Sequence, residues 1–272
     1  MTDLTELARR FHSLHTADRP LVLPNAWDTA GARIIADTGA AAIATTSAGV
    51  AWDLGAADGD RLDRGAALDR LARICSAVDI PVTADIEGGY AETADGVADT
   101  IRAVLAAGAV GVNIEDGIRP ADEHTARIAV ARAAADATDV PLFVNARIDV
   151  FLAGIGAEPD RLKETLKRAA ACIAAGADGI FVPGVVDPRT VEALAHGIDA
   201  PLNVMAGPGA PDTAELARLG AARVSVGSQI AQAAHALVRE AARELLTSGT
   251  YTALSGGYDY LELNALLGAE RA

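Results

Sequence analysis

The chain has 272 residues, a formal net charge of −14 at pH 7, 51% hydrophobic residues and only 4% aromatic residues. This negative balance argues against binding to nucleic acid or to an anionic membrane surface. The length is normal for one α/β barrel, so we expect a single domain over residues 1–272.

The first residues carry neither the basic segment nor the apolar segment of a secretory signal, and no apolar run is long enough to span a bilayer. The two cysteines, Cys75 and Cys172, lie in apolar helical patterns. This usage is typical of small buried thiols in a reducing compartment and predicts no disulfide framework. We therefore expect a cytoplasmic protein without a membrane segment.

Eight short apolar segments bounded by turn signals are predicted to be β-strands. They are nearly continuous in hydrophobicity and rich in Val and Ile, as is typical of parallel strands covered on both faces. In chain order they are residues 21–26, 41–47, 81–87, 111–116, 141–149, 179–184, 201–206 and 223–228.

The entrances to these strands alternate between two patterns. Odd-numbered strands follow Asp-x-Pro and even-numbered strands follow Gly-Ala, which suit a strand start and a helix end respectively. Helical patterns lie between the strands, for example at residues 68–78, 97–107, 125–137 and 162–175. Eight alternating β and α units predict an α/β fold, a single TIM-type (β/α)₈ barrel. An open doubly wound sheet is the rival, and the count of eight disfavours it.

Two further segments extend beyond the minimal barrel. Residues 52–60 are acidic and glycine-rich, which predicts a loop over the carboxyl-terminal face, where barrel enzymes build their sites. Residues 229–248 have a helical pattern, and the tail at 251–267 adds more structure than barrel closure requires. We expect residues 229–272 to form a helical extension that is exchanged with a neighbouring subunit.

Carboxylates end the third and fourth strands. Residues i and i+2 of a strand face the same side, so Asp85 is predicted to project with Glu87, and Asn113 with Glu115. Three acids in one place repel one another unless a cation lies among them. Oxygen ligands without a His/Cys cluster favour Mg²⁺, with Mn²⁺ as an alternative, over zinc.

Other strand ends add polar groups to this set. The fifth strand places Asn145, Arg147 and Asp149 on one face, and the seventh supplies Asn203. A metal together with Arg147 forms a natural clamp for a small dianion such as a 2-oxo acid. The second strand ends in small residues whose amides and hydroxyls suit a carboxylate or phosphonate, although an ordinary turn is the alternative. These residues are Thr46, Ser47 and Ala48.

Taken together and in order, several segments resemble the isocitrate lyase / phosphoenolpyruvate mutase superfamily, especially its short single-domain bacterial members. These segments are residues 24–28, 46–51, 84–90, 113–117, 145–149, 201–204 and 223–228. The resemblance implies enolate chemistry that breaks or forms C–C or P–C bonds next to a 2-oxo acid. It also implies homotetramers, as dimers of dimers, in which a C-terminal helix packs onto a partner's barrel. Residues 229–248 are the candidate for that helix.

The resemblance also implies roles for individual residues. Asp85, Glu87 and Glu115 would hold Mg²⁺, and Asp58 would reach the metal through water. Asp58, Glu115 and Arg147 would be the catalytic groups. The remaining residues would bind the carboxylate or phosphonate of a small anionic 2-oxo acid together with Arg147 and Asp85. They are Thr46, Ser47, Ala48, Asn113 and Asn203.

The chain departs from the superfamily in its acid/base devices. Isocitrate-type lyases carry Lys-x-Cys-Gly-His after the fourth strand, whereas residues 115–124 here contain neither that lysine nor that cysteine. The longer gating loop of the phosphonate enzymes, with its lysine and asparagine, is absent as well. The sixth strand ends in Val-Pro-Gly, where methylisocitrate-type lyases resemble Pro-Glu.

The leading hypothesis is therefore a Mg²⁺-dependent lyase that acts on a small 2-oxo or 2-hydroxy dicarboxylate through a metal-stabilised enolate. Oxaloacetate decarboxylation depends least on the missing acid/base residues, because an enolate that forms on Mg²⁺ needs only later protonation from solvent. The proton donor stays open among a metal-bound water, His124 and Arg119. A phosphonomutase or phosphonopyruvate hydrolase is the alternative, and a 2-oxo-acid-binding protein with little turnover is the second alternative. A purely structural barrel would leave the acids unexplained.

Overall fold

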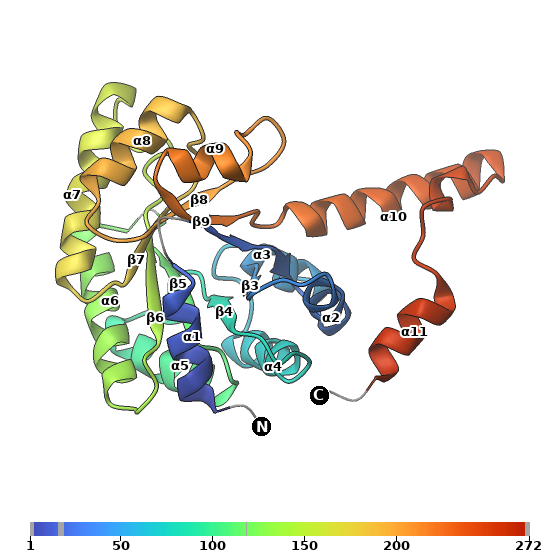
Figure 1. The fold of residues 1–272 in the computed structure, drawn as a ribbon, viewed down its shortest axis with the longest axis horizontal. Coiled ribbons are helices and arrows are strands. Elements are labelled where there is room, and N and C mark those ends of the chain that lie inside the picture. Colours follow the sequence, from blue (N-terminus) through green and yellow to red (C-terminus); the bar gives the residue numbers. More distant parts are fainter. Residues whose placement is uncertain (1–2, 16–18, 118, 270–272) are drawn as a thin grey trace.

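All strands of the described chain lie in one parallel sheet, ordered β1-β9-β8-β7-β6-β5-β4-β3-β2 (Figure 1). The computed structural model describes residues 3–15, 19–117 and 119–269. The strands are β1 (Leu21–Leu23), β2 (Asn25–Ala26), β3 (Ile43–Thr45), β4 (Val82–Asp85), β5 (Gly111–Glu115), β6 (Phe143–Arg147), β7 (Gly179–Val182), β8 (Leu202–Met205) and β9 (Ala221–Ser225).

The first predicted strand is divided at Pro24, and this division closes the barrel. β1 pairs with β9, whereas β2, one residue later, pairs with β3. The Asn25 side chain joins both sides, because it donates to the Thr45 carbonyl (3.0 Å) and accepts from the Val226 amide (3.0 Å). β1 and β2 thus act as one strand of an eight-stranded ring. The (β/α)₈ barrel is confirmed, and the doubly wound sheet is excluded.

Helices follow the strands and cover the outside of the ring. They are α2 (Thr29–Asp37), α3 (Ser47–Asp53), α4 (Arg64–Cys75), α5 (Ala94–Ala106), α6 (Ala121–Asp136), η1 (Glu158–Asp160), α7 (Arg161–Ala174), α8 (Pro188–Gly197) and α9 (Thr213–Arg218). Side-chain caps begin many of them: Asp28, Asp63 and Asp187 each accept a hydrogen bond from a first-turn amide. The four helices predicted from the sequence lie within a few residues of α4, α5, α6 and α7.

The amino-terminal helix α1 (Leu4–Ser13) closes the floor of the barrel. Phe11 is fully buried and makes an edge-to-face contact with Phe143 at 5.6 Å between ring centroids. Phe11 belongs to an apolar cluster with residues at or just before the starts of several strands, such as Leu21, which begins β1, and Val110, which precedes β5. The floor is therefore sealed by side chains, and only the opposite end of the barrel is available for a site.

The C-terminal extension begins with α10 (Gln229–Ser248), which matches the predicted helix and projects away from the barrel (Figure 1). The chain then turns at η2 (Thr252–Leu254), and α11 (Tyr260–Gly268) packs beside α2, where Arg33 donates to the Leu266 carbonyl at 2.6 Å. Much of α10 is exposed, including Leu246 at 85%. Its exchange with a partner subunit stays a prediction.

Within the three described ranges, every helix is too short or too polar to cross a lipid bilayer.

Candidate active site

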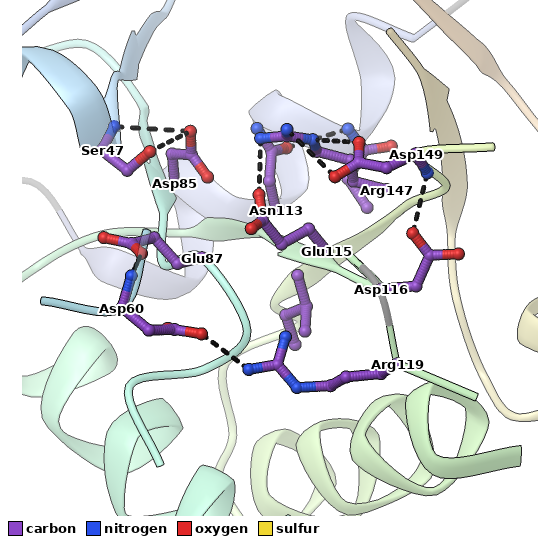
Figure 2. Close-up of polar contacts among 12 residues, drawn as sticks. Ser47, Asp60, Asp85, Glu87, Asn113, Glu115, Asp116, Arg119, Arg147 and Asp149 are labelled. Atoms are coloured by element: carbon purple, nitrogen blue, oxygen red, sulfur yellow. Dashed lines mark hydrogen bonds and ion pairs between the residues drawn. The ribbon is translucent and has the colours of Figure 1, made fainter. Parts of the chain in front are cut away.

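Three neighbouring strands bring the predicted acids and arginine to the same mouth of the barrel. β4, β5 and β6 are paired in register, with Asp85 opposite Asn113 and Glu115 opposite Arg147. All three strands run in the same direction, so their final residues converge at the carboxyl-terminal face, where barrel enzymes carry out chemistry. Figure 2 shows these side chains facing one another across a short gap.

Asp85 is anchored from the second strand end. Its Oδ2 accepts hydrogen bonds from the Ser47 hydroxyl (3.1 Å) and, more weakly, the Ser47 amide (3.4 Å). Ser47 was predicted to end the second strand, but that strand, β3, ends at Thr45. Residues 47 and 48 instead form the first turn of α3, which Thr46 caps. The Asp85 Oδ1 is buried and has no hydrogen-bond partner. Ser47 therefore orients a carboxylate that keeps one oxygen free.

Asp58 lies close enough to Asp85 for the two charges to interact. Burial raises the pKa of Asp58, the Asp85 charge raises it further, and the Ser47 hydroxyl opposes the shift. Asp58 therefore lies near Asp85 at the mouth of the barrel, and its predicted contact with a metal through water stays a prediction.

Glu87 reaches the site by a different route from the one predicted. β4 ends at Asp85, and Glu87 lies in the following turn with φ = 49°, so the two residues do not share a strand face as expected. The glycines at 88 and 89 permit this turn. Glu87 is 1% exposed; its Oε2 accepts a hydrogen bond from the Asp60 amide, and its Oε1 has no partner. Burial raises the pKa of Glu87 to about 7; the Asp60 amide opposes the rise, and the Asp58 charge adds to it.

Glu115 and Arg147 form an ion pair on adjacent strands. Arg147 Nη1 lies 2.6 Å from Glu115 Oε2, and its Nε and Nη2 contact the two oxygens of Asp149 at 2.7 and 3.1 Å. This two-point contact fixes the guanidinium plane. Burial raises the pKa of Glu115 to about 8 even though Arg147 opposes the shift. Asp149 was noted in the sequence as lying on the same face as Arg147, but its role as an anchor was not predicted.

Below the acids, a buried polar layer spans the inside of the barrel. Asn145 Nδ2 donates to Asn113 Oδ1 (2.9 Å) and to Asn203 Oδ1 (3.2 Å), and Arg223 Nη2 donates to Asn113 Oδ1 (3.1 Å). All four side chains are at most 5% exposed. Asn113 and Asn203 were predicted to bind the substrate. In the structure their side-chain oxygens accept hydrogen bonds within this layer, which lies beneath the acids. Arg223 was missed, although a charged residue within an apolar strand is a signal that could have identified it.

The rim of the mouth carries Arg119, which follows β5 and lies 2.6 Å from Asp60 Oδ2 (Figure 2). His124, the other candidate proton donor, lies elsewhere. It is buried on α6, and its ring nitrogens face the Ile114 carbonyl (3.0 Å) and the Cys172 sulfur (3.5 Å). Burial lowers the pKa of His124. An imidazole between the barrel and α7 is poorly placed to protonate a substrate at the mouth.

The site residues fit a hard divalent cation, although its ligands are not fully assembled. In the described part of the chain, no three Asp, Glu, His or Cys side chains already converge as a metal site. The Glu115 carboxylate is held by Arg147 instead. Asp85 and Glu87 each present a buried carboxylate oxygen without a partner, and such orphaned anionic atoms are costly unless a cation meets them. The all-oxygen donor set suits Mg²⁺ or Mn²⁺.

The phosphoenolpyruvate phosphomutase family model matches residues 11–246, which include every strand and all the site residues described above. The chain belongs to this family. The resemblance to the isocitrate lyase / phosphoenolpyruvate mutase superfamily inferred from the sequence is thereby confirmed.

Proteins similar to this chain include one that is uncharacterised and one with a named activity. An uncharacterised protein of Mycobacterium tuberculosis (strain ATCC 25618 / H37Rv) is 38% identical over 218 residues, covering 80% of this chain and 81% of that protein. An oxaloacetate decarboxylase of Pseudomonas aeruginosa (strain UCBPP-PA14) is 29% identical over 271 residues, covering 94% of this chain and 93% of the enzyme.

Solved structures share the family's barrel. A candidate lyase/mutase from Burkholderia cenocepacia J2315 aligns with a TM-score of 0.90 and 37% identity, covering 98% of this chain and 97% of that one. A candidate phosphonomutase from the same organism gives 0.84 and 43% identity, covering 88% and 99%. A phosphonopyruvate hydrolase solved with oxalate and Mg²⁺ shares the fold at a TM-score of 0.83 and 24% identity, covering 96% and 94%.

Proposed function

We propose that the protein is a Mg²⁺-dependent lyase that breaks a C–C bond of a small 2-oxo dicarboxylate, and that it decarboxylates oxaloacetate. The observation that carries this proposal is the pair of unpartnered carboxylate oxygens, on Asp85 and Glu87, beside the anchored guanidinium of Arg147. The oxaloacetate decarboxylase named above is similar over nearly the whole chain, which supports the choice of reaction.

Asp85, Glu87 and Glu115 are the proposed metal ligands, with Asp58 acting through water. The bound cation would supply electrostatic stabilisation of the negative charge that develops on the 2-oxo oxygen of the substrate. Mg²⁺ is the first choice because the donors are all oxygen, and Mn²⁺ is the alternative. The phosphonopyruvate hydrolase that shares this fold was solved with Mg²⁺, which supports the same choice.

The remaining side chains orient the substrate and exclude water. Arg147, held flat by Asp149, offers N–H groups to a substrate carboxylate when Glu115 turns toward the cation. Ser47 and the first turn of α3 lie on the opposite side of Asp85 and are proposed to meet the other end of the anion. The amides of Asn113 and Asn203 keep the floor rigid. Loss of carbon dioxide from oxaloacetate leaves a carbon that needs one proton, which solvent provides, so pyruvate results.

A phosphonate reaction is the second candidate because the Burkholderia candidate phosphonomutase is 43% identical. The connection between β5 and α6 disfavours it. β5 ends at Glu115 and α6 already begins at Ala121, which leaves too little chain to cover a phosphonyl group. Arg119 within this connection is moreover tied to Asp60.

The C-terminal extension completes the proposed assembly. We propose a homotetramer in which α10 packs onto the barrel of a partner, because its exposed leucines find no covering surface in the described chain.

The function is tested by following a mixed pool of oxaloacetate, 2-methylisocitrate, isocitrate, dimethylmalate and phosphonopyruvate by NMR. The protein is assayed with Mg²⁺, with EDTA, and as Asp85→Asn, which keeps the side-chain shape but removes the charge. Oxaloacetate loss above the spontaneous rate, only with Mg²⁺ and intact Asp85, is the expected result. Consumption of phosphonopyruvate alone would replace the proposal with the phosphonate reading. Metal-dependent line broadening without product would favour a binding protein.

A further inference from the structure

Three residues with strained backbones surround the acidic site. Asp60, Glu87 and Tyr90 have φ angles of 55°, 49° and 49°, and no other non-glycine residue of the described ranges has a positive φ. Side chains disfavour this left-handed region, so such residues persist only where surrounding contacts hold them in place. All three residues lie in the part of the mouth that carries the proposed metal ligands. Contacts with neighbouring residues must therefore hold the backbone there in this conformation.

The contacts that hold it run through Asp60. The Asp60 amide donates to the Glu87 carboxylate, and the Asp60 carboxylate lies 2.6 Å from Arg119 Nη2. Asp60 belongs to the segment between α3 and α4, whereas Arg119 belongs to the short connection between β5 and α6. One ion pair therefore joins two segments from opposite sides of the turn that carries Glu87.

Arg119 also lies directly on that turn. A Cβ atom added at Gly88 would come within 2.5–2.6 Å of the Arg119 guanidinium, so the guanidinium packs against the backbone next to Glu87. Glu123 contacts the same side chain more loosely, at 3.7 Å. Arg119 thus covers the turn, and Asp60 fixes the position of Arg119.

The surroundings leave room for these segments to separate. A cavity of about 260 Å³ lies beside the ion pair and is lined by Asp60, Leu62, Tyr90, Ala91, Glu92 and Arg119. The side chains of Arg119 and Asp60 are 23% and 38% exposed. An exposed ion pair alone contributes little to global stability, so its effect here is expected to be local.

We infer that the Asp60–Arg119 ion pair is a latch that positions Glu87 for the metal by holding the Asp60 amide against its carboxylate. This inference rests on the proposed metal-dependent function. Both residues are positioning residues: neither is a metal ligand, and the pair takes the place of a long lid in ordering the mouth.

The latch is tested with Asp60→Asn and Arg119→Gln. Asparagine tolerates the left-handed backbone of position 60, so Asp60→Asn removes the ion pair without adding strain. Mn²⁺ binding is measured by calorimetry without substrate, and hydrogen exchange of the Asp60 amide is measured in metal-free protein. We expect each variant to weaken Mn²⁺ binding about tenfold and to speed exchange of the Asp60 amide about tenfold.

The double variant and two controls separate the latch from a general loss of structure. If the pair acts as a unit, the double variant weakens Mn²⁺ binding no more than either single variant, whereas independent effects would multiply to about a hundredfold. Arg119→Lys keeps the charge and is expected to restore binding to within about threefold of the original protein. Arg102→Gln removes the exposed Arg102–Asp99 ion pair on α5 and is expected to change neither measurement.

The possible results distinguish the latch from the proposed function. If the original protein binds Mn²⁺, unchanged affinity in both single variants, or independent effects that multiply in the double variant, overturns the latch. If the original protein binds no Mn²⁺ but exchange of the Asp60 amide is faster in both variants, the proposed metal-dependent function is wrong. The ion pair then still holds Glu87 in place, but not for a metal. If neither binding nor exchange changes, the latch itself is wrong.

Discussion

At the scale of single residues, the buried acids make the metal-free protein sensitive to pH. The pKa of Glu115 is raised to about 8 and that of Glu87 to about 7, from an ordinary value of 4.5, chiefly by burial. Between pH 4.5 and about pH 8, the folded protein therefore binds more protons than the unfolded chain, and its stability falls as the pH rises. His15, whose pKa burial lowers to about 3, acts in the opposite direction but only below pH 6.5.

We therefore expect the free energy of unfolding of the metal-free protein to fall by about 2–3 kcal/mol between pH 6.5 and pH 8.5. Thermal unfolding in EDTA, followed by circular dichroism, measures this change. Glu115→Gln should remove most of the decline, and saturating Mg²⁺ should remove it too because the cation replaces the protons. A stability that is flat or rising over this range in EDTA would contradict the assignment of these acids.

The sequence predicted which residues carry charge at the mouth, but not how they contact one another. Asp85, Glu115 and Arg147 follow from strand periodicity, because each ends a strand whose direction the barrel fixes. The Asp60–Arg119 pair joins two connecting segments 59 residues apart, and no periodicity relates such segments. Contacts between loops depend on the finished shape of the barrel.

At the scale of elements, strand positions were predictable and strand ends were less so. The Asp-x-Pro and Gly-Ala entrances mark where chains change direction, and each predicted strand is present. The predicted strand at 81–87 nevertheless ends at Asp85, because the glycines that follow favour a turn over further pairing. The packing of α1 against the barrel floor was not predicted, because that surface exists only after the strands assemble.

The contact between α1 and the floor depends on Gly111 at the start of β5. A Cβ atom at this position would lie 2.8 Å from the Phe11 ring and 2.8 Å from Thr83 Oγ1. We expect Gly111→Ala to lower the free energy of unfolding by about 1–3 kcal/mol through overpacking.

Urea unfolding of Gly111→Ala measures this loss. Gly256→Ala is the matched control, because nothing lies within 4 Å of a Cβ atom there, and it should leave the urea midpoint nearly unchanged. Equal midpoints for the two variants would show that the floor yields to accommodate the methyl group.

At the scale of the whole molecule, the C-terminal extension is the part that the barrel leaves uncovered. Val238 on α10 is 66% exposed, Leu246 is 85% exposed, and Leu261 on α11 is 74% exposed. Soluble proteins rarely leave so many large apolar side chains together in water. This exposure supports the homotetramer expected from the sequence.

Sedimentation velocity tests that assembly. We expect the original protein to sediment as a tetramer and Leu245→Glu/Leu246→Glu, on α10, to sediment as a smaller species, because buried carboxylates oppose association. Val22→Glu, at a 47% exposed position on β1, is the control and should leave the sedimentation coefficient unchanged. A monomeric original protein, or an unchanged double variant, would contradict the tetramer.

The seam between β1 and β9 has a consequence for the order in which the molecule is completed. Neighbouring strands elsewhere in the ring belong to successive units of the chain, whereas the seam joins segments that Asn25 and Val226 hold together across 201 residues. Closing so long a loop is slow compared with local pairing. β9 also carries Arg223, which completes the polar layer under the acids. During synthesis, the polar layer is therefore the last part of the site to form. A chain released before β9 is made carries every proposed metal ligand on an unfinished barrel.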